Sequence, residues 1–244
     1  HSFTDAEKAL MNTYESLDYD PLHSPLYKKY IHELNVEAGK KCNKICLSKW
    51  TTYALVGIIV GSLAYLCAIA VEGLLDFKYE VTNEYIKKNE LVGGYIVYAL
   101  INVIFVGIAT CLVSFVEPVA AGSGIPELKS YLNGTNYLKL LRLKTLVCKL
   151  VGVTFSVSGG LIIGKEGPMV HSGAVLAANL SHLTGMRKHE WTHSFLYRFR
   201  NDRDKRDFVS GGAAAGVAAA FGAPIGGVLF SLEEAASYWS VSLT

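Results

Sequence analysis

The sequence has few charged residues for its length. Asp, Glu, Lys and Arg make up 18% of the 244 residues, whereas an ordinary soluble domain has about 25%. The formal net charge is only +2, so there is no strong electrostatic case for binding nucleic acid. Four long stretches are nearly free of charge, and these are residues 50–76, 93–121, 145–183 and 208–232. This distribution is typical of an integral membrane protein with polar ends and loops.

The sequence also lacks the patterns of a disulfide scaffold, a zinc site and a repeat protein. The five cysteines are odd in number, and three of them lie in apolar runs, where packing is their expected role: Cys67, Cys111 and Cys148. Cys42 and Cys46 have no second His or Cys pair nearby with the spacing of zinc ligands. Strand signals are poor, and no long repeat or heptad pattern occurs. We therefore expect an all-α fold, with no metal site and no resident cofactor.

Two apolar runs are long enough to cross a bilayer. They cover residues 50–75 and 93–116, and a polar connector at 76–92 joins them. Four lysines come just before the first run, namely Lys40, Lys41, Lys44 and Lys49. Because positively charged flanks stay on the cytosolic side, we expect residues 1–49 to form a cytosolic N-terminal segment and residues 50–244 to form the membrane domain.

The remaining apolar runs are shorter and are interrupted by glycine and proline. A break at 120–124 precedes a short helical stretch, and Gly222-Ala223-Pro224 divides the last run. The other runs cover 145–163 and 169–183, and residues 184–207 read as a polar loop. Such segments are typical of discontinuous helices whose ends meet inside the membrane and bind ions there. The glycines and alanines at 211–227 also fit a simple packing role, since small residues let helices approach closely.

One of these breaks nearly spells a phosphate-binding loop. In "GGLIIGKEGPMVHSG" (159–173), Gly159 and Gly164-Lys165 match G-x-x-x-x-G-K, but Glu166 stands where a Ser or Thr hydroxyl should hold Mg²⁺. The preceding run is too long and apolar for a single strand, and the carboxylate would repel phosphate. These features argue against a nucleotide site.

An anion site inside the membrane explains the same residues better. The backbone N–H groups at a helix N-terminus carry a partial positive charge and attract anions. The Glu166 carboxylate is itself an anion, so it can occupy the site that its own helix end creates and leave when it is protonated. Burial and the helix dipole act in opposite directions on its proton affinity. The plainer alternatives are a Glu166 that is paired only for packing and a Lys165 that extends to the interface.

Three separated motifs resemble the signature stretches of the CLC chloride channels and transporters. They are "GSGIPE" (122–127), "GKEGP" (164–168) and "GAPIGGVLFSLEE" (222–234), and they occur in the family's order over residues 50–244. The stretches "YESLDYD" (14–20), "EPVAAGSGIPE" (117–127) and 203–227 look most like the late-endosomal and lysosomal chloride/proton exchangers. The resemblance implies the CLC membrane fold, with tilted, re-entrant and discontinuous helices in inverted repeats, of which this chain would be the first. It also implies a homodimer.

The resemblance also implies roles for particular residues. Glu166 matches the gating glutamate, and Glu234 matches the inner proton-transfer glutamate of the exchangers. Ser123 matches the serine whose hydroxyl binds the central anion, and Lys165 would support the site electrostatically. Backbone amides would complete the anion sites, at Gly124, Ile125, Gly164 and Gly167. Without the family match, the Glu233-Glu234 pair reads as a solvated helix end.

The implied function is voltage-dependent chloride transport across an intracellular membrane, coupled to protons, and not enzyme catalysis. A passive voltage-gated chloride channel is the alternative within the family, and Glu234 argues against it. A non-transporting membrane module is the second alternative. The chain lacks the family's second inverted half, with its anion-binding tyrosine, and the nucleotide-sensing CBS domains. We therefore expect it to be part of a longer protein and to transport nothing alone. The compartment, nucleotide regulation and an accessory β-subunit stay open.

Overall fold

The computed structural model describes residues 42–135, 137, 139–183 and 202–235. Within these ranges every element is helical, which confirms the all-α expectation. The elements are α3 (Cys42–Lys87), α4 (Leu91–Cys111), η1 (Leu112–Val116), η2 (Pro118–Ala120), α5 (Ile125–Leu132), α6 (Leu143–Ser158), α7 (Glu166–Leu183), α9 (Asp202–Phe221), α10 (Pro224–Phe230) and η4 (Ser231–Ala235). The motif "YESLDYD" lies outside the described residues.

The first helix is longer than the sequence pattern predicts. α3 has 46 residues and continues to Lys87, so the prediction of a polar connector from residue 76 is wrong. No glycine or proline interrupts residues 74–92, and the buried Lys78 ties this part of the helix to its neighbours. Its Nζ donates hydrogen bonds to the Ser158 carbonyl (2.8 Å) and to Asn102 Oδ1 (3.3 Å). At about 1.5 Å per residue, α3 is about 69 Å long, well beyond a hydrocarbon core of about 30 Å.

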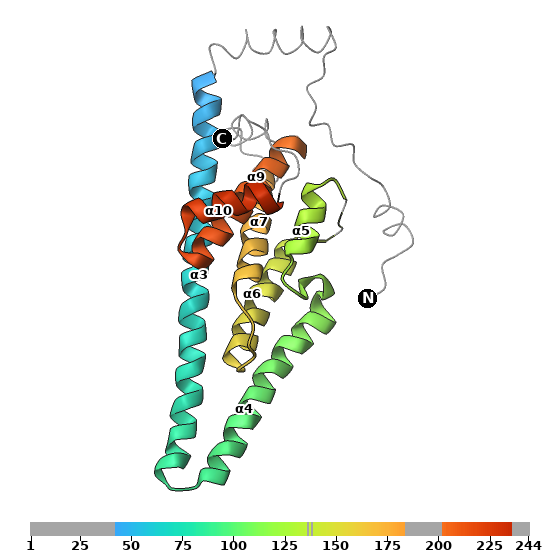
Figure 1. Ribbon diagram of the computed structural model, residues 1–244. Helices are drawn as coiled ribbons and strands as arrows, with labels where there is room; N and C mark the ends of the chain where they lie inside the picture. Colours follow the sequence, from blue (N-terminus) through green and yellow to red (C-terminus); the bar gives the residue numbers. More distant parts are fainter. Residues whose placement is uncertain (1–41, 136, 138, 184–201, 236–244) are drawn as a thin grey trace, which may run out of the picture.

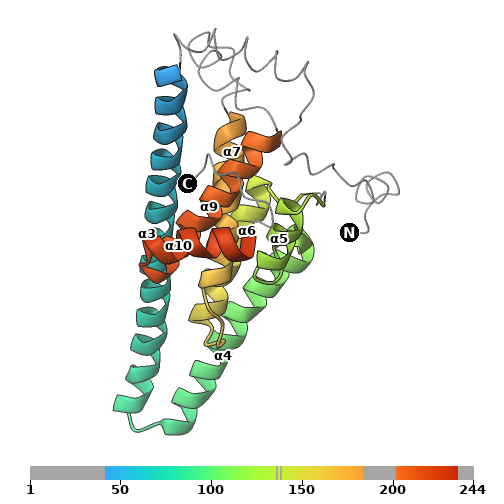
Figure 2. The same ribbon diagram turned by 45° about the horizontal axis from the view of Figure 1, so that its top comes forward.

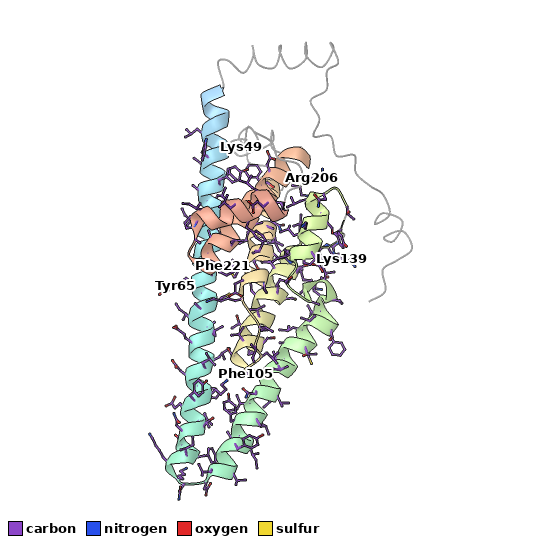
Figure 3. The ribbon with its side chains drawn as sticks, viewed as in Figure 1. Lys49, Tyr65, Phe105, Lys139, Arg206 and Phe221 are labelled. Carbon is purple, nitrogen blue, oxygen red and sulfur yellow. The ribbon has the colours of Figure 1, made fainter. Side chains whose placement is uncertain are left out.

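α3 and α4 form a long splayed hairpin that encloses the other helices on two sides (Figure 1). A left-handed Asn89 (φ 60°) reverses the chain between them. Both helices are long and apolar enough to cross a membrane, and only 11% of the most apolar stretch of each is buried. Apolar side chains such as Tyr65, which is 67% exposed, project outward along the hairpin (Figure 3). This agrees with the two long apolar spans that the sequence predicts.

The core lies where α5, α7 and α9 meet. Leu128 and Leu132 pack against Val170, Ala174 and Ala178 of α7 and against Val209, Ala213 and Val217 of α9. α7 and α9 run side by side in both views (Figures 1 and 2). A Cβ added at Gly173 would collide with the Gly212 carbonyl, and one at Gly216 would lie 2.5 Å from the Met169 carbonyl. The glycines of 211–227 therefore allow backbone-to-backbone packing.

The predicted breaks are present, but some helix boundaries differ. Gly222 has φ +65° and separates α9 from α10, as the glycine-proline pattern indicates. α9 begins at Asp202, so the last six residues of the expected polar loop 184–207 are helical. α3 begins at Cys42, before the expected domain boundary at residue 50. A hydrogen-bonded ion pair of 3.2 Å between Lys49 Nζ and Asp207 Oδ2 joins these two helix starts.

Candidate anion-binding site

The first motif loop ends in a glycine turn that starts α5. Gly122 (φ +71°) and Gly124 (φ +81°) are both left-handed, a conformation that glycine adopts without steric cost. Pro126 is in the first turn of α5. A backbone N–H at this position would have no acceptor within the helix, so the missing N–H of proline costs no hydrogen bond. The Ile125 N–H donates to Ser123 Oγ over 3.4 Å. The turn therefore brings the Ser123 hydroxyl and the Ile125 N–H close together at the start of α5.

The second motif loop leads from α6 into α7. Gly160 (φ +79°) turns the chain after α6, and Glu166 is the first residue of α7. The half-buried Glu166 side chain folds back over its own loop, since a Cβ added at Gly164 would collide with Glu166 Oε2. The carboxylate thus lies beside Gly164, at the end of the loop that leads into α7.

The structure brings the two loops into contact. A Cβ added at Gly167 would lie 2.6 Å from Ser123 Cβ and 3.3 Å from Ser123 Cα. A cavity of about 700 Å³ opens at this contact, and five of the predicted site residues line it: Ser123, Ile125, Gly164, Glu166 and Gly167. Segments about forty residues apart in the sequence therefore form one candidate site.

Two predicted residues lie elsewhere. Gly124 is buried and does not line the cavity. Lys165 lines a second cavity of about 380 Å³, together with Glu72 of α3. Glu166 borders both cavities. Lys165 therefore lines a different cavity from the one that Ser123 lines.

The sequence analysis missed two buried polar residues beside the loops. Lys149 of α6 lines the larger cavity and is 2% exposed, and His171 of α7 is 1% exposed. Lys149 Nζ lies 2.7 Å from His171 Nδ1. The available signal was a single lysine within the apolar run 145–163 and a histidine near the start of the run 169–183. Polar groups buried at membrane depth are rarely without a function.

The backbone of Glu234 lies in η4, a π-helical turn packed against α5 and α9. The hydroxyls of Ser231 and Ser210 lie 2.6 Å apart, and Ser231 Oγ also donates to the Ser210 carbonyl over 3.0 Å. These bonds attach η4 to α9. Glu233 is exposed, and the Glu234 side chain is outside the described residues, so its role stays a prediction.

Comparison with known proteins identifies the family. The family model described as voltage gated chloride channel matches residues 105–244, more than half of the chain. The chain belongs to this family. The mouse H(+)/Cl(-) exchange transporter 7 is 48% identical over 242 residues, which cover 98% of this chain and 30% of that protein. Chloride channel protein A of Dictyostelium discoideum is 42% identical over 246 residues, which cover 100% of this chain and 28% of that protein.

Solved structures of CLC proteins share the fold. A eukaryotic CLC transporter superimposes with a TM-score of 0.72 at 27% identity, covering 82% of this chain and 35% of that one. A slow cyanobacterial Cl⁻/H⁺ antiporter gives a TM-score of 0.66 at 27% identity, covering 80% of this chain and 42% of that one. The CLC chain described here thus has the helical membrane fold of these transporters, and it spans less than one third of the length of the two curated relatives.

Proposed function

We propose that this chain forms the first half of a membrane domain that exchanges chloride for protons. The observation that carries the proposal is the contact between Ser123 and Gly167, which places a hydroxyl beside the helix end that holds Glu166. A hydroxyl, helix-start amides and a carboxylate at one cavity are the groups that an anion site with a competing carboxylate needs.

The mechanism follows from competition for this site. Chloride accepts hydrogen bonds from the Ser123 hydroxyl and from backbone amides at the starts of α5 and α7. The Glu166 carboxylate occupies the α7 end when it is ionised, and it leaves when a proton neutralises it. Because Glu166 lines both cavities, open space adjoins its side chain in which it can move. Chloride and a proton therefore displace each other, and this displacement is the basis of coupling.

Glu234 is the proposed inner carrier of the proton. The similarity to proteins named H(+)/Cl(-) exchange transporter 7 and to a Cl⁻/H⁺ antiporter supports exchange over a passive channel. We further propose a homodimer in a late-endosomal or lysosomal membrane, with residues 1–49 in the cytosol. The transport is voltage-dependent, because chloride and protons that move in opposite directions carry net charge across the membrane in the same direction.

The test uses the full-length protein that carries this chain, reconstituted in liposomes. A chloride gradient should drive protons uphill. Glu166→Ala should abolish the coupling, and Glu234→Ala should abolish proton movement while chloride still flows. Two exposed glutamates provide controls, Glu84→Ala for the first variant and Glu233→Ala for the second. Chloride flux without protons in the unmodified protein would identify a channel, and no flux of either ion would identify a non-transporting module. Proton movement that persists in Glu234→Ala would disprove the assigned carrier.

A further inference from the structure

The C-terminal end of α6 has a carbonyl that its own turn does not satisfy. Gly160 is left-handed (φ +79°), and its N–H donates to the Val157 carbonyl over 3.0 Å. The Leu161 N–H donates to the Ser156 carbonyl over 3.3 Å. These two bonds form a Schellman motif, which satisfies two of the last carbonyls of a helix. Ser158, the last residue of α6, is 0% exposed, so its carbonyl needs a donor from elsewhere in the protein.

The missing donor comes from α3. Lys78 Nζ donates to the Ser158 carbonyl over 2.8 Å and to Asn102 Oδ1 of α4 over 3.3 Å. The ring centroids of Tyr79 and Tyr98 lie 5.3 and 5.1 Å from the same nitrogen. A buried ammonium is costly unless it is hydrogen-bonded, and Lys78 is 1% exposed. These contacts, together with the negative end of the α6 dipole, compensate that cost and join three helices at one point.

The same point is where the second motif loop begins. A Cβ added at Gly159 would lie 2.8 Å from Val106 Cγ2, and one at Gly160 would lie 3.7 Å from Asn102 Oδ1. The turn therefore packs directly against α4. The next residues, 161–163, are all exposed. The turn at the end of α6 is thus the attachment of this loop to α3 and α4.

The loop in turn carries Glu166, which follows Gly160 by six residues. The Glu166 carboxylate lies over Gly164 of the same loop, so the position of the loop determines where the carboxylate lies. A displaced loop would weaken the interaction of the ionised carboxylate with the proposed anion site. Protonation then competes with a weaker interaction, so the proton-dependent release of Glu166 extends to higher pH.

We propose that Lys78 is a positioning residue for proton-coupled exchange. From α3 it completes the C-terminal cap of α6, and it thereby holds the second motif loop where Glu166 can occupy the anion site. Lys78 lines neither of the two cavities beside Glu166, so it acts through the loop and not by contact with chloride. The inference rests on the proposed function.

The first measurement is hydrogen exchange of the segment 159–165 by mass spectrometry, on the full-length protein in detergent. Lys78→Met should speed the exchange of the Gly160 and Leu161 amides about tenfold or more, because a hydrogen bond from a charged group is lost. Lys87→Met is the matched control, since Lys87 is on the same helix and exposed, and it should leave exchange unchanged. This measurement tests the cap without reference to transport.

The second measurement is the pH dependence of chloride-driven proton flux in liposomes. Lys78→Met should raise the pH of half-maximal flux by up to about one unit, because a tenfold change in an equilibrium corresponds to one pH unit. Asn102→Leu removes an acceptor of Lys78 and leaves its charge in place, so it should raise this pH by less and speed exchange severalfold. A general loss of stability would lower the maximal flux and leave the pH of half-maximal flux unchanged.

The other titratable groups beside Glu166 are the same in all of these proteins. They line the two cavities from α3, α6 and the second motif loop, and they are Cys67, Glu72, Cys148, Lys149 and Lys165. A difference between the variants therefore does not come from these groups.

Three results would each overturn the inference. One is exchange in Lys78→Met within twofold of the Lys87→Met control, and another is a pH of half-maximal flux that does not rise. The third is a rise in Lys78→Met but not in Asn102→Leu, which would identify a direct effect of the charge. If Lys78→Met does not fold, exchange and the pH of half-maximal flux in Asn102→Leu decide by the same criteria. Proton-coupled flux in the unmodified protein tests the proposed function separately, so a working exchanger with unshifted variants would reject only the role of Lys78.

Discussion

Gly167→Ala offers a sharp test of the contact between the two motif loops. Gly167 is in the first turn of α7, and its φ is not in the left-handed region. Alanine should therefore suit the helix backbone and even favour it by up to about 1 kcal/mol. Any loss of function must then come from what the new methyl group touches.

The magnitude follows from the distances. The added Cβ would lie 2.6 Å from Ser123 Cβ and 3.3 Å from Ser123 Cα, whereas carbon atoms in ordinary contact are about 3.5–4.0 Å apart. No side-chain rotation moves a Cβ, so the Ser123 backbone must shift by about 1 Å. Overpacking of this kind costs about 1–3 kcal/mol. If the whole of this free energy is lost from chloride binding at the displaced Ser123 hydroxyl, chloride affinity falls by about 5- to 150-fold.

The assay is calorimetric chloride binding to the full-length protein, together with its thermal unfolding. Gly107→Ala is the control, because a Cβ there has no neighbour within 4 Å. A folded Gly167→Ala protein that binds chloride as tightly as the control would refute the reasoning, since it would show that the Ser123 loop does not determine the site.

Two further predictions concern the stability of the helix bundle. Gly212→Ala places a methyl group 2.5 Å from Ala177 Cβ and should destabilise the fold by about 1–3 kcal/mol. The control is Gly57→Ala, because a Cβ at Gly57 has no neighbour within 4 Å. The Gly212→Ala protein should have a lower midpoint of thermal unfolding than this control. Lys78→Met removes the donor to the last carbonyl of α6 and should cost about 1–3 kcal/mol. The exposed Lys87→Met is its control, and equal melting of these two proteins would contradict the prediction.

Much of the fold follows from the sequence because the bilayer restricts the choices. A long apolar run without proline forms a helix there, as α3 and α4 do, although each helix contains glycines. The glycine-proline patterns at 124–126 and 222–224 predict helix breaks, and Gly124 and Gly222 are left-handed at these breaks. The position at which α3 ends could not be predicted from the sequence. Its polar last turns resemble a loop until Asn102 and the Ser158 carbonyl are known to hold Lys78.

The candidate site was also predictable from the sequence only in part. The sequence by itself determined that Glu166 stands at a helix start beside glycines, and that Ser123 follows a flexible turn. Only the tertiary structure decided that Gly167 touches Ser123, that Lys165 lines a separate cavity, and that Lys149 and His171 meet beside Gly124. The reason is physical: helix starts and glycine turns are local properties of the chain, whereas the direction from which a charge reaches an ion depends on how α5, α6 and α7 pack.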